Sequence, residues 1–265
     1  MDVSEVLDDL LDEQESLDWV VAELGDGQFA AQTPSPRWSI ADQLGHLTFF
    51  DTTAALAINA PSAFIDHRDE LITSFADDLA VDEATLGSFR RLAPAEQLNA
   101  WRHGRLDLEA AARTLDNDTR VEWYGPSMGS KSFLTARLME VWAHGQDVCD
   151  TVGAMREPTD RIRHIAQLGF ITRGWSYIVR GEQPPDGAVR VELTAPSGDT
   201  WTWGPDDAAD TVEGPAEDFC LVVTQRRNIA DTRLDVIGEL ATDWMDKAQA
   251  FAGSPTDGPE PKGST

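Results

Sequence analysis

The spacing of the apolar residues constrains the possible folds of this chain most, because it changes once along the sequence from a helical to an alternating pattern. Up to about residue 155, apolar side chains recur every three or four positions, as at Val6, Leu10, Leu17 and Val21. This spacing places them on one face of an amphipathic helix. Over residues 188–194 they alternate with polar residues instead, which is typical of a half-buried strand. The sequence therefore predicts a helical part followed by a smaller α+β part.

Prolines and glycines divide these two parts into elements. In the first part we expect helices at residues 3–24, 40–59, 66–75, 82–92, 94–115 and 132–152. After them we expect a helix at 159–179, a hairpin of strands near 188–194 and 201–203, a short strand near 211–213, and helices at 215–227 and 237–251. The predicted organisation is a helical part at 1–155, a connecting helix within 156–184, an α+β domain at 185–252 and a disordered tail at 253–265.

The net charge of the chain limits the classes of partner that it can bind. It has 21 basic and 47 acidic residues, a formal net charge of -26. Such a surface repels nucleic acids and anionic membranes, so we expect neither as a partner. The sequence has no apolar run long enough to span a bilayer, and its first residues are acidic, unlike a secretory signal. We therefore expect a cytoplasmic protein that acts on a small molecule, as a monomer or a homodimer.

Two of the five histidines lie in the most apolar stretches of predicted helices. His144 follows Glu140 by four residues, so both side chains project from one helix face, and His46 lies on another helix. Imidazole and carboxylate groups are ligands for zinc and similar divalent metals. Hydrogen-bonded core histidines and an ordinary i,i+4 pair explain the same pattern, so the residues alone leave both interpretations open. The other histidines are predicted at the surface: His67, His103 and His164.

Two segments carry a family resemblance. Residues 38–47 read WSIADQLGHL and residues 137–148 read RLMEVWAHGQDV, with Ser39 as a predicted helix cap and Asp42 three residues later. Together they resemble the metal-binding signature of the DinB-like superfamily, and in particular its mycothiol-dependent maleylpyruvate isomerase group. The resemblance implies a mainly α fold, an up-down four-helix bundle with a smaller C-terminal α+β domain.

The resemblance also implies a ligand set and a reaction. His46, Glu140 and His144 would hold one divalent metal ion, zinc first, with nickel, iron and manganese as alternatives. Arg226 is the implied catalytic residue from the C-terminal domain. Gln225 stands where the group has glycine, so Arg227 competes with Arg226 for the role.

Three functions remain in view. The first is a metal-dependent enzyme that uses a low-molecular-weight thiol, mycothiol, for S-transfer to a small electrophile or for its isomerisation. The second is a thiol-independent lyase, cyclase or hydrolase that acts on a biosynthetic intermediate. The third is a non-catalytic metal-binding protein, which would need a fourth protein ligand. Asp51 and Asp147 are the candidates for that ligand, and Asp147 could instead orient an imidazole.

Overall fold

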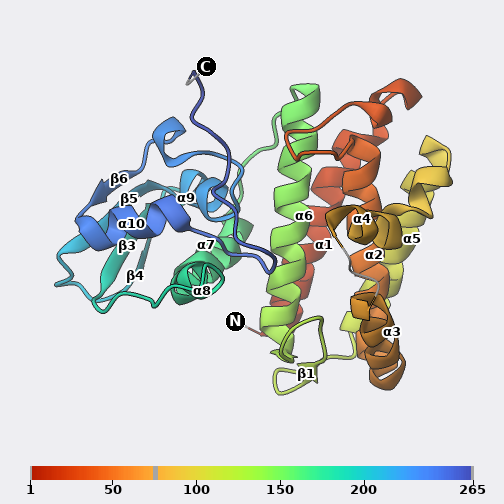
Figure 1. The fold of residues 1–265 in the computed structure, drawn as a ribbon, viewed down its shortest axis with the longest axis horizontal. Coiled ribbons are helices and arrows are strands. Elements are labelled where there is room, and N and C mark those ends of the chain that lie inside the picture. Colours follow the sequence, from red (N-terminus) through yellow and green to blue (C-terminus); the bar gives the residue numbers. More distant parts are fainter. Residues whose placement is uncertain (1, 74–76, 264–265) are drawn as a thin grey trace. The chain divides into compact units, whose positions relative to one another are not determined.

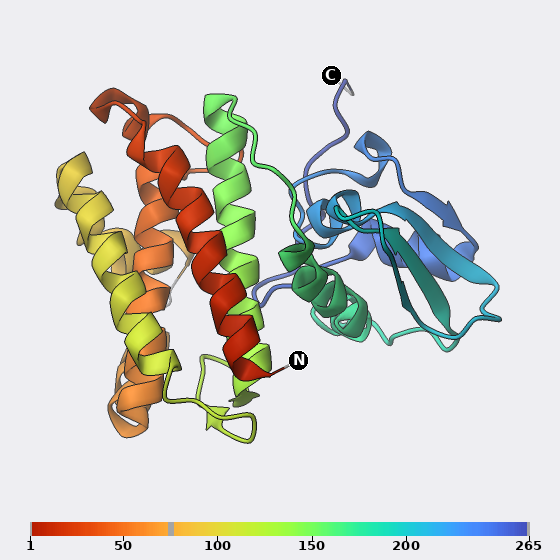
Figure 2. The ribbon, with the colours of Figure 1, turned by 180° about the vertical axis from the view of Figure 1, so that it is seen from behind.

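The computed structural model describes residues 2–73 and 77–263. The chain divides into two compact units, Met1–Arg156 and Glu157–Thr265. The first is a bundle of helices, and the second combines helices with a small sheet (Figures 1 and 2). Among the described residues, no helix combines the length and apolar character needed to cross a membrane. The helical bundle of the first unit and the small sheet of the second confirm the predicted mainly α fold with an additional α+β part.

Four long helices form the bundle of the first unit. They are α1 (Val3–Ala22), α2 (Ile40–Asn59), α5 (Pro94–Ala112) and α6 (Ser130–Val152). Helix α2 packs against α5 and α6, and α1 packs against the same two helices. The shorter elements are η1 (Asp26–Ala30), α3 (Pro61–Thr73), α4 (Asp78–Leu86), η2 (Phe89–Arg91), β1 (Arg120–Val121) and β2 (Met128–Gly129).

The bundle differs in one respect from simple alternation of helix directions. Helices α2 and α5 run in the same direction, and α1 and α6 run in the opposite one (Figures 1 and 2). Along the chain, the four helices therefore run up, down, down and up. Helices α2 and α5 can both run down because the chain, after α3 and α4, is back at the end of the bundle where α2 began. Helix α5 approaches α2 closely at Gly104, where an added Cβ would lie 3.4 Å from Thr52 Oγ1.

The second unit contains a four-stranded sheet in the order β4-β3-β5-β6. The strands are β3 (Val189–Thr194), β4 (Thr200–Trp203), β5 (Asp210–Pro215) and β6 (Asp235–Ile237). Strands β3 and β4 pair antiparallel, with Leu193 opposite Trp201, which confirms the predicted hairpin. Strand β3 pairs in parallel with β5, and β5 pairs antiparallel with β6. The helical elements are η3 (Asp160–Ile162), α7 (Arg163–Ile171), α8 (Arg173–Ile178), α9 (Ala216–Val223), η4 (Ile229–Asp231) and α10 (Glu239–Lys247).

All three predicted helices of this unit differ from the structure, and the one expected at 215–227 is α9, which already ends at Val223. The helix expected at 159–179 is divided at Thr172, whose hydroxyl donates a 2.8 Å hydrogen bond to the Leu168 carbonyl. The helix expected at 237–251 begins at Glu239, because Ile237 still pairs with Thr211 in β6. Strand β6 was not predicted: its three residues are too few to show an alternating pattern.

The tail from residue 253 contains no helix or strand as far as residue 263. Hydrogen bonds nevertheless hold it at several points. The Thr256 carbonyl accepts from Gln225 Nε2 at 2.9 Å, and the Pro259 carbonyl accepts from Asn228 Nδ2 at 3.0 Å.

Candidate metal centre

The start of α2 is built by a capping box that the sequence predicted. The Asp42 amide donates to Ser39 Oγ at 3.3 Å, and the Ser39 amide donates to Asp42 Oδ2 at 2.9 Å. These bonds satisfy amides that have no partner within the helix. His46 lies two turns after this cap, and its ring is 4.9 Å from the Trp38 ring. The cap therefore fixes the residue at which α2 begins, two turns before His46.

His46 from α2 meets Glu140 and His144 from α6. Glu140 Oε2 lies 3.2 Å from His46 Nε2 and 3.0 Å from His144 Nε2. One donor atom of each residue lies within 4.8 Å of the others, and this is the grouping among the described residues that could hold a metal ion. The three side chains are 16%, 21% and 10% exposed for His46, Glu140 and His144. The triad is thus mostly buried.

The spacing of these atoms fits a first-row divalent ion. Metal–ligand distances near 2.0–2.1 Å place neighbouring ligands of a tetrahedral zinc site roughly 3.3 Å apart. The two nitrogen–oxygen distances of 3.0 and 3.2 Å are close to that value. Two imidazoles and one carboxylate are also a donor set that catalytic zinc sites use. We conclude that the residues present fit the implied metal.

The protonation of the triad also favours a cation. Burial is the main cause that lowers the pKa of His46 to about 4. Burial alone would raise the pKa of Glu140, but hydrogen bonds to His144 and His46 outweigh it and hold this pKa well below its ordinary value. At neutral pH, His46 is therefore neutral and Glu140 is ionised, and these are the forms that bind a metal ion.

Gln43 holds the His144 ring, a role that the sequence did not reveal. Gln43 Oε1 lies 2.5 Å from His144 Nδ1, which leaves Nε2 to face Glu140. Gln43 Nε2 in turn donates to Thr33 Oγ1 at 2.8 Å. Gln43 precedes His46 by three residues, so the two lie on one face of α2, and this spacing was the available signal.

The two aspartates considered as a fourth ligand have other partners. Asp147 Oδ2 is 3.9 Å from His144 Nδ1 and accepts a 2.9 Å hydrogen bond from Ser35 Oγ. The interaction that orients His144 is thus made more closely by Gln43. Asp51 lies apart from the metal-ligand grouping, in a buried pair with Arg137. Burial is the main cause that raises the pKa of Asp51 to about 6, although Arg137 opposes the rise.

Arg226 lies just after α9 in the second unit. Its side chain donates to the Thr224 carbonyl at 2.6 Å, and its amide donates to the Leu221 carbonyl at 2.7 Å. Gln225 adopts a φ of 59°, a left-handed conformation that glycine reaches more easily. Gln225 therefore holds a backbone conformation that is strained for a residue with a Cβ. The catalytic role of Arg226, and the competing role of Arg227, stay predictions.

The remaining histidines lie outside the triad. His103 is exposed, and its Nε2 is 3.6 Å from Asp107, as expected for a surface residue. His67 is part-buried, with Nε2 3.3 Å from the Tyr124 hydroxyl. His164 is 7% exposed, so the prediction that it lies at the surface was wrong. Its position on the inner face of α7 decides this, although Arg161 and Arg163 beside it suggested a solvated segment.

Comparison with known proteins places the first unit in a family. The family described as "Mycothiol maleylpyruvate isomerase N-terminal domain" matches residues 10–149, and "Wyosine base formation" matches residues 185–238. Two uncharacterized proteins, from two strains of Mycobacterium tuberculosis, are each 44% identical to the chain over 249 residues, which are 93% of this chain and 95% of theirs.

Two crystal structures share the fold of the chain. Both are of the mycothiol-dependent maleylpyruvate isomerase, and one is of a mutant. Their TM-scores are 0.57 for the mutant and 0.56 for the other structure, with sequence identities of 15% and 17%. Each comparison covers 85% of this chain and 90% of the other. The resemblance read from the two sequence signatures is confirmed: the chain belongs to the mycothiol maleylpyruvate isomerase N-terminal domain family.

Proposed function

We propose that this protein is a cytoplasmic, metal-dependent enzyme that uses a low-molecular-weight thiol for isomerisation of a small electrophile or for S-transfer to it. One observation carries the proposal: His46, Glu140 and His144 bring three donor atoms within 4.8 Å of one another. Three protein ligands leave coordination positions open, as catalytic rather than structural sites do. Membership of the family favours mycothiol as the thiol and isomerisation as the reaction.

The residues of the site suit this chemistry. A bound divalent ion, zinc first, would lower the pKa of a thiol and so supply a thiolate near neutral pH. Glu140 contributes a negative charge, and His46, neutral at this pH, has no proton to lose before it binds a cation. Gln43 keeps the His144 ring in one orientation, so that its Nε2 faces the centre. The chain thus supplies an ionised carboxylate, a neutral imidazole at His46 and a second imidazole that Gln43 orients.

We assign Arg226 to the binding of a carboxylate on the substrate or the thiol, with Arg227 as the alternative. A guanidinium binds a carboxylate through two parallel hydrogen bonds, which orients it as well as holding it. Maleylpyruvate, the substrate named for the structural relatives, is a carboxylate-bearing electrophile and is the first compound to test.

The first experiment measures metal. We expect the purified protein to bind about one equivalent of zinc by elemental analysis. His144→Ala should weaken zinc binding more than about 100-fold in chelator competition, because even outer partners of a metal ligand are worth roughly 10- to 100-fold. His103→Ala is the matched control, since His103 is 77% exposed and lies outside the triad. Wild-type protein that binds no divalent metal would refute the proposal.

The second experiment separates a thiol enzyme from the two other functions. With cobalt in place of zinc, addition of mycothiol should produce a thiolate-to-metal charge-transfer band, which His144→Ala should abolish. Turnover of maleylpyruvate should then require mycothiol. Turnover of another substrate without thiol would favour a lyase, cyclase or hydrolase. Metal binding with neither the band nor turnover would leave a non-catalytic metal-binding protein.

A further inference from the structure

A pair of opposite charges lies in the interior of the bundle, outside the triad. The side chains of Asp51 on α2 and Arg137 on α6 are 0% and 4% exposed, and Arg137 Nε lies 3.5 Å from Asp51 Oδ1. These two atoms and Arg137 Nη2 have no hydrogen-bond partner in the part of the chain that the structure describes. Burying charges with such incomplete compensation opposes folding. A contribution to stability therefore does not explain the pair.

The pair joins the two helices that supply the triad. Asp51 follows His46 by five residues on α2, and Arg137 precedes Glu140 by three residues on α6. At 1.5 Å per residue these separations are about 7.5 and 4.5 Å along the helices. The charged pair and the His46–Glu140 contact are thus neighbouring links between the same two helices.

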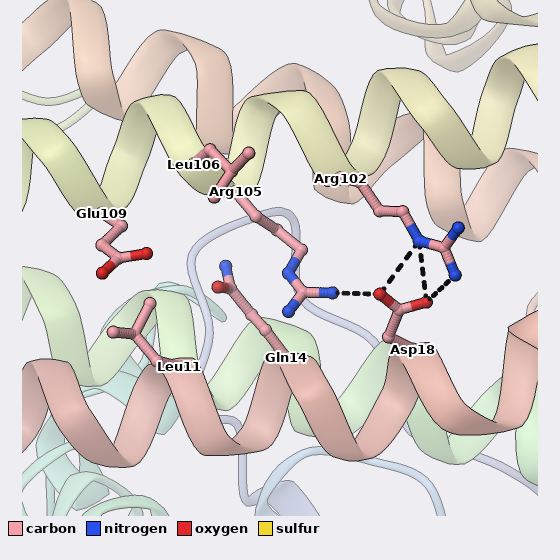
Figure 3. Close-up of a pocket in the computed structure, with 7 residues that line it drawn as sticks. All are labelled: Leu11, Gln14, Asp18, Arg102, Arg105, Leu106 and Glu109. Carbon is pink, nitrogen blue, oxygen red and sulfur yellow. Dashed lines mark hydrogen bonds and ion pairs between the residues drawn. The ribbon is translucent and has the colours of Figure 1, made fainter.

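Phe50 connects the pair to His46 directly. The Arg137 guanidinium lies 5.6 Å from the centre of the Phe50 ring, and the same ring is 4.6 Å from the His46 ring. From a third helix, Gln14 Nε2 donates to Asp51 Oδ2 at 3.3 Å. Gln14 extends from α1 and also lines a pocket of about 180 Å³ between α1 and α5 (Figure 3). Side chains from α1, α2 and α6 therefore converge beside the triad.

We propose that Asp51 and Arg137 are positioning residues, which fix the alignment of α2 against α6 and so hold His46 opposite Glu140. Apolar contacts between helices tolerate small sliding and rotation, whereas a buried ion pair has one preferred alignment. A metal site needs its ligands within about 0.5 Å of the productive geometry. The inference rests on the proposed metal centre, because it concerns the same three ligands.

The test replaces the pair with apolar residues of similar size. Removal of one partner would leave a buried, uncompensated charge, which destabilises the protein for that reason alone, so Asp51→Leu and Arg137→Met are combined. We expect the metal-free double variant to unfold at the same or a higher urea concentration than wild type. Its zinc dissociation constant, measured by chelator competition, should rise about 10- to 100-fold. The cobalt-substituted protein should show an altered d–d spectrum.

A second buried ion pair provides the control. Arg156 Nη1 lies 2.7 Å from Glu13 Oε1, with side chains 8% and 5% exposed, and neither residue is a proposed ligand. Glu13→Leu combined with Arg156→Met should leave zinc affinity within threefold of wild type. Arg137→Lys keeps the charge opposite Asp51, so we expect it to retain affinity within about threefold. If the apolar double variant fails to fold, Arg137→Lys tests the positioning role by itself.

The outcomes separate the two proposals. Wild-type protein that takes up no zinc refutes the metal centre, and the positioning role with it. Wild type that binds zinc, together with an apolar double variant of equal affinity, refutes the positioning role alone. A loss of affinity as large in the Glu13 and Arg156 control as in the Asp51 and Arg137 variant would also refute it, because any buried charge would then have the same effect. If only Arg137→Lys folds, a cobalt spectrum and affinity far from those of wild type would contradict the proposal.

Discussion

Two seams between helices of the bundle carry charged residues, and they differ in how much water reaches them. In the α2–α6 seam, which carries the triad, Asp51 and Arg137 are 0% and 4% exposed. In the α1–α5 seam, Asp18 and Arg102 are 12% and 41% exposed, and Arg102 Nη2 lies 2.6 Å from Asp18 Oδ1. Figure 3 shows this second seam as an open pocket in which one carboxylate is held by two guanidinium groups.

The comparison sets a partly exposed ion pair, Asp18 and Arg102, against an almost fully buried one, Asp51 and Arg137. Water solvates the partly exposed pair, so its contribution to folding is small in either direction. In the α2–α6 seam water is largely absent, so each charge or hydrogen bond there affects the free energy more strongly. Three expected results sharpen this contrast, and they decrease in size.

The largest is the pH dependence that His46 gives the metal-free protein. Its pKa falls from 6.5 to about 4 in the folded state, so the unfolded chain takes up this proton first as the pH decreases. The contribution of His46 to the free energy of unfolding is therefore full above pH 6.5 and is lost as the pH falls toward 4, by about 3 kcal/mol. Urea unfolding at pH 7.5 and pH 4, with chelator present, measures it. His46→Gln should remove this part of the loss, and an equal loss in that variant would contradict the assignment.

The intermediate effect concerns Gln43. Its amide oxygen lies 2.5 Å from His144 Nδ1, so Gln43→Ala frees the imidazole to rotate. We expect the zinc dissociation constant to rise roughly 10- to 100-fold, equivalent to about 1.4 to 2.7 kcal/mol. Isothermal titration with zinc measures the change. Gln97→Ala is the control, since this buried glutamine donates to the Phe89 carbonyl at 2.8 Å and lies outside the triad. Unchanged zinc affinity in Gln43→Ala would show that the packing of Trp38 on the ring suffices.

The smallest effect belongs to the α1–α5 seam. Arg102→Ala leaves Asp18 bound to Arg105 at 2.8 Å, so the carboxylate keeps a partner. We expect the free energy of unfolding to change by at most about 1 kcal/mol and zinc affinity not to change. Urea unfolding at low and high salt measures it, since salt screens an exposed pair. A loss of several kcal/mol would mean that this seam is as poorly hydrated as the other.

Much of the fold and part of the candidate site followed from local patterns. The capping box of Ser39 and Asp42 marks the start of α2, and the i,i+4 spacing of Glu140 and His144 places both on one helix face. The C-cap of α6 at Gly153, with φ of 69°, was equally readable. Such features depend on residues within one or two turns of each other, so the sequence contains them in full.

Other features depend on residues far apart in the chain. Strand β6 forms because it pairs with β5, and its three residues show no pattern that predicts this pairing. His164 is buried although arginines flank it. The direction of α5 depends on how α3 and α4 return the chain, which their own periodicity does not specify.

By itself, the sequence determined that α2 and α6 are helices, that Glu140 and His144 share one face of α6, and that His46 lies on the other helix. Only the tertiary structure decided that Gln43 orients His144 and that Asp51 pairs with Arg137 rather than joining the triad. The physical reason is the range of the interactions. Helix caps and helix faces are set within a few residues, whereas the partner of a buried polar group depends on which helices pack together and in what register.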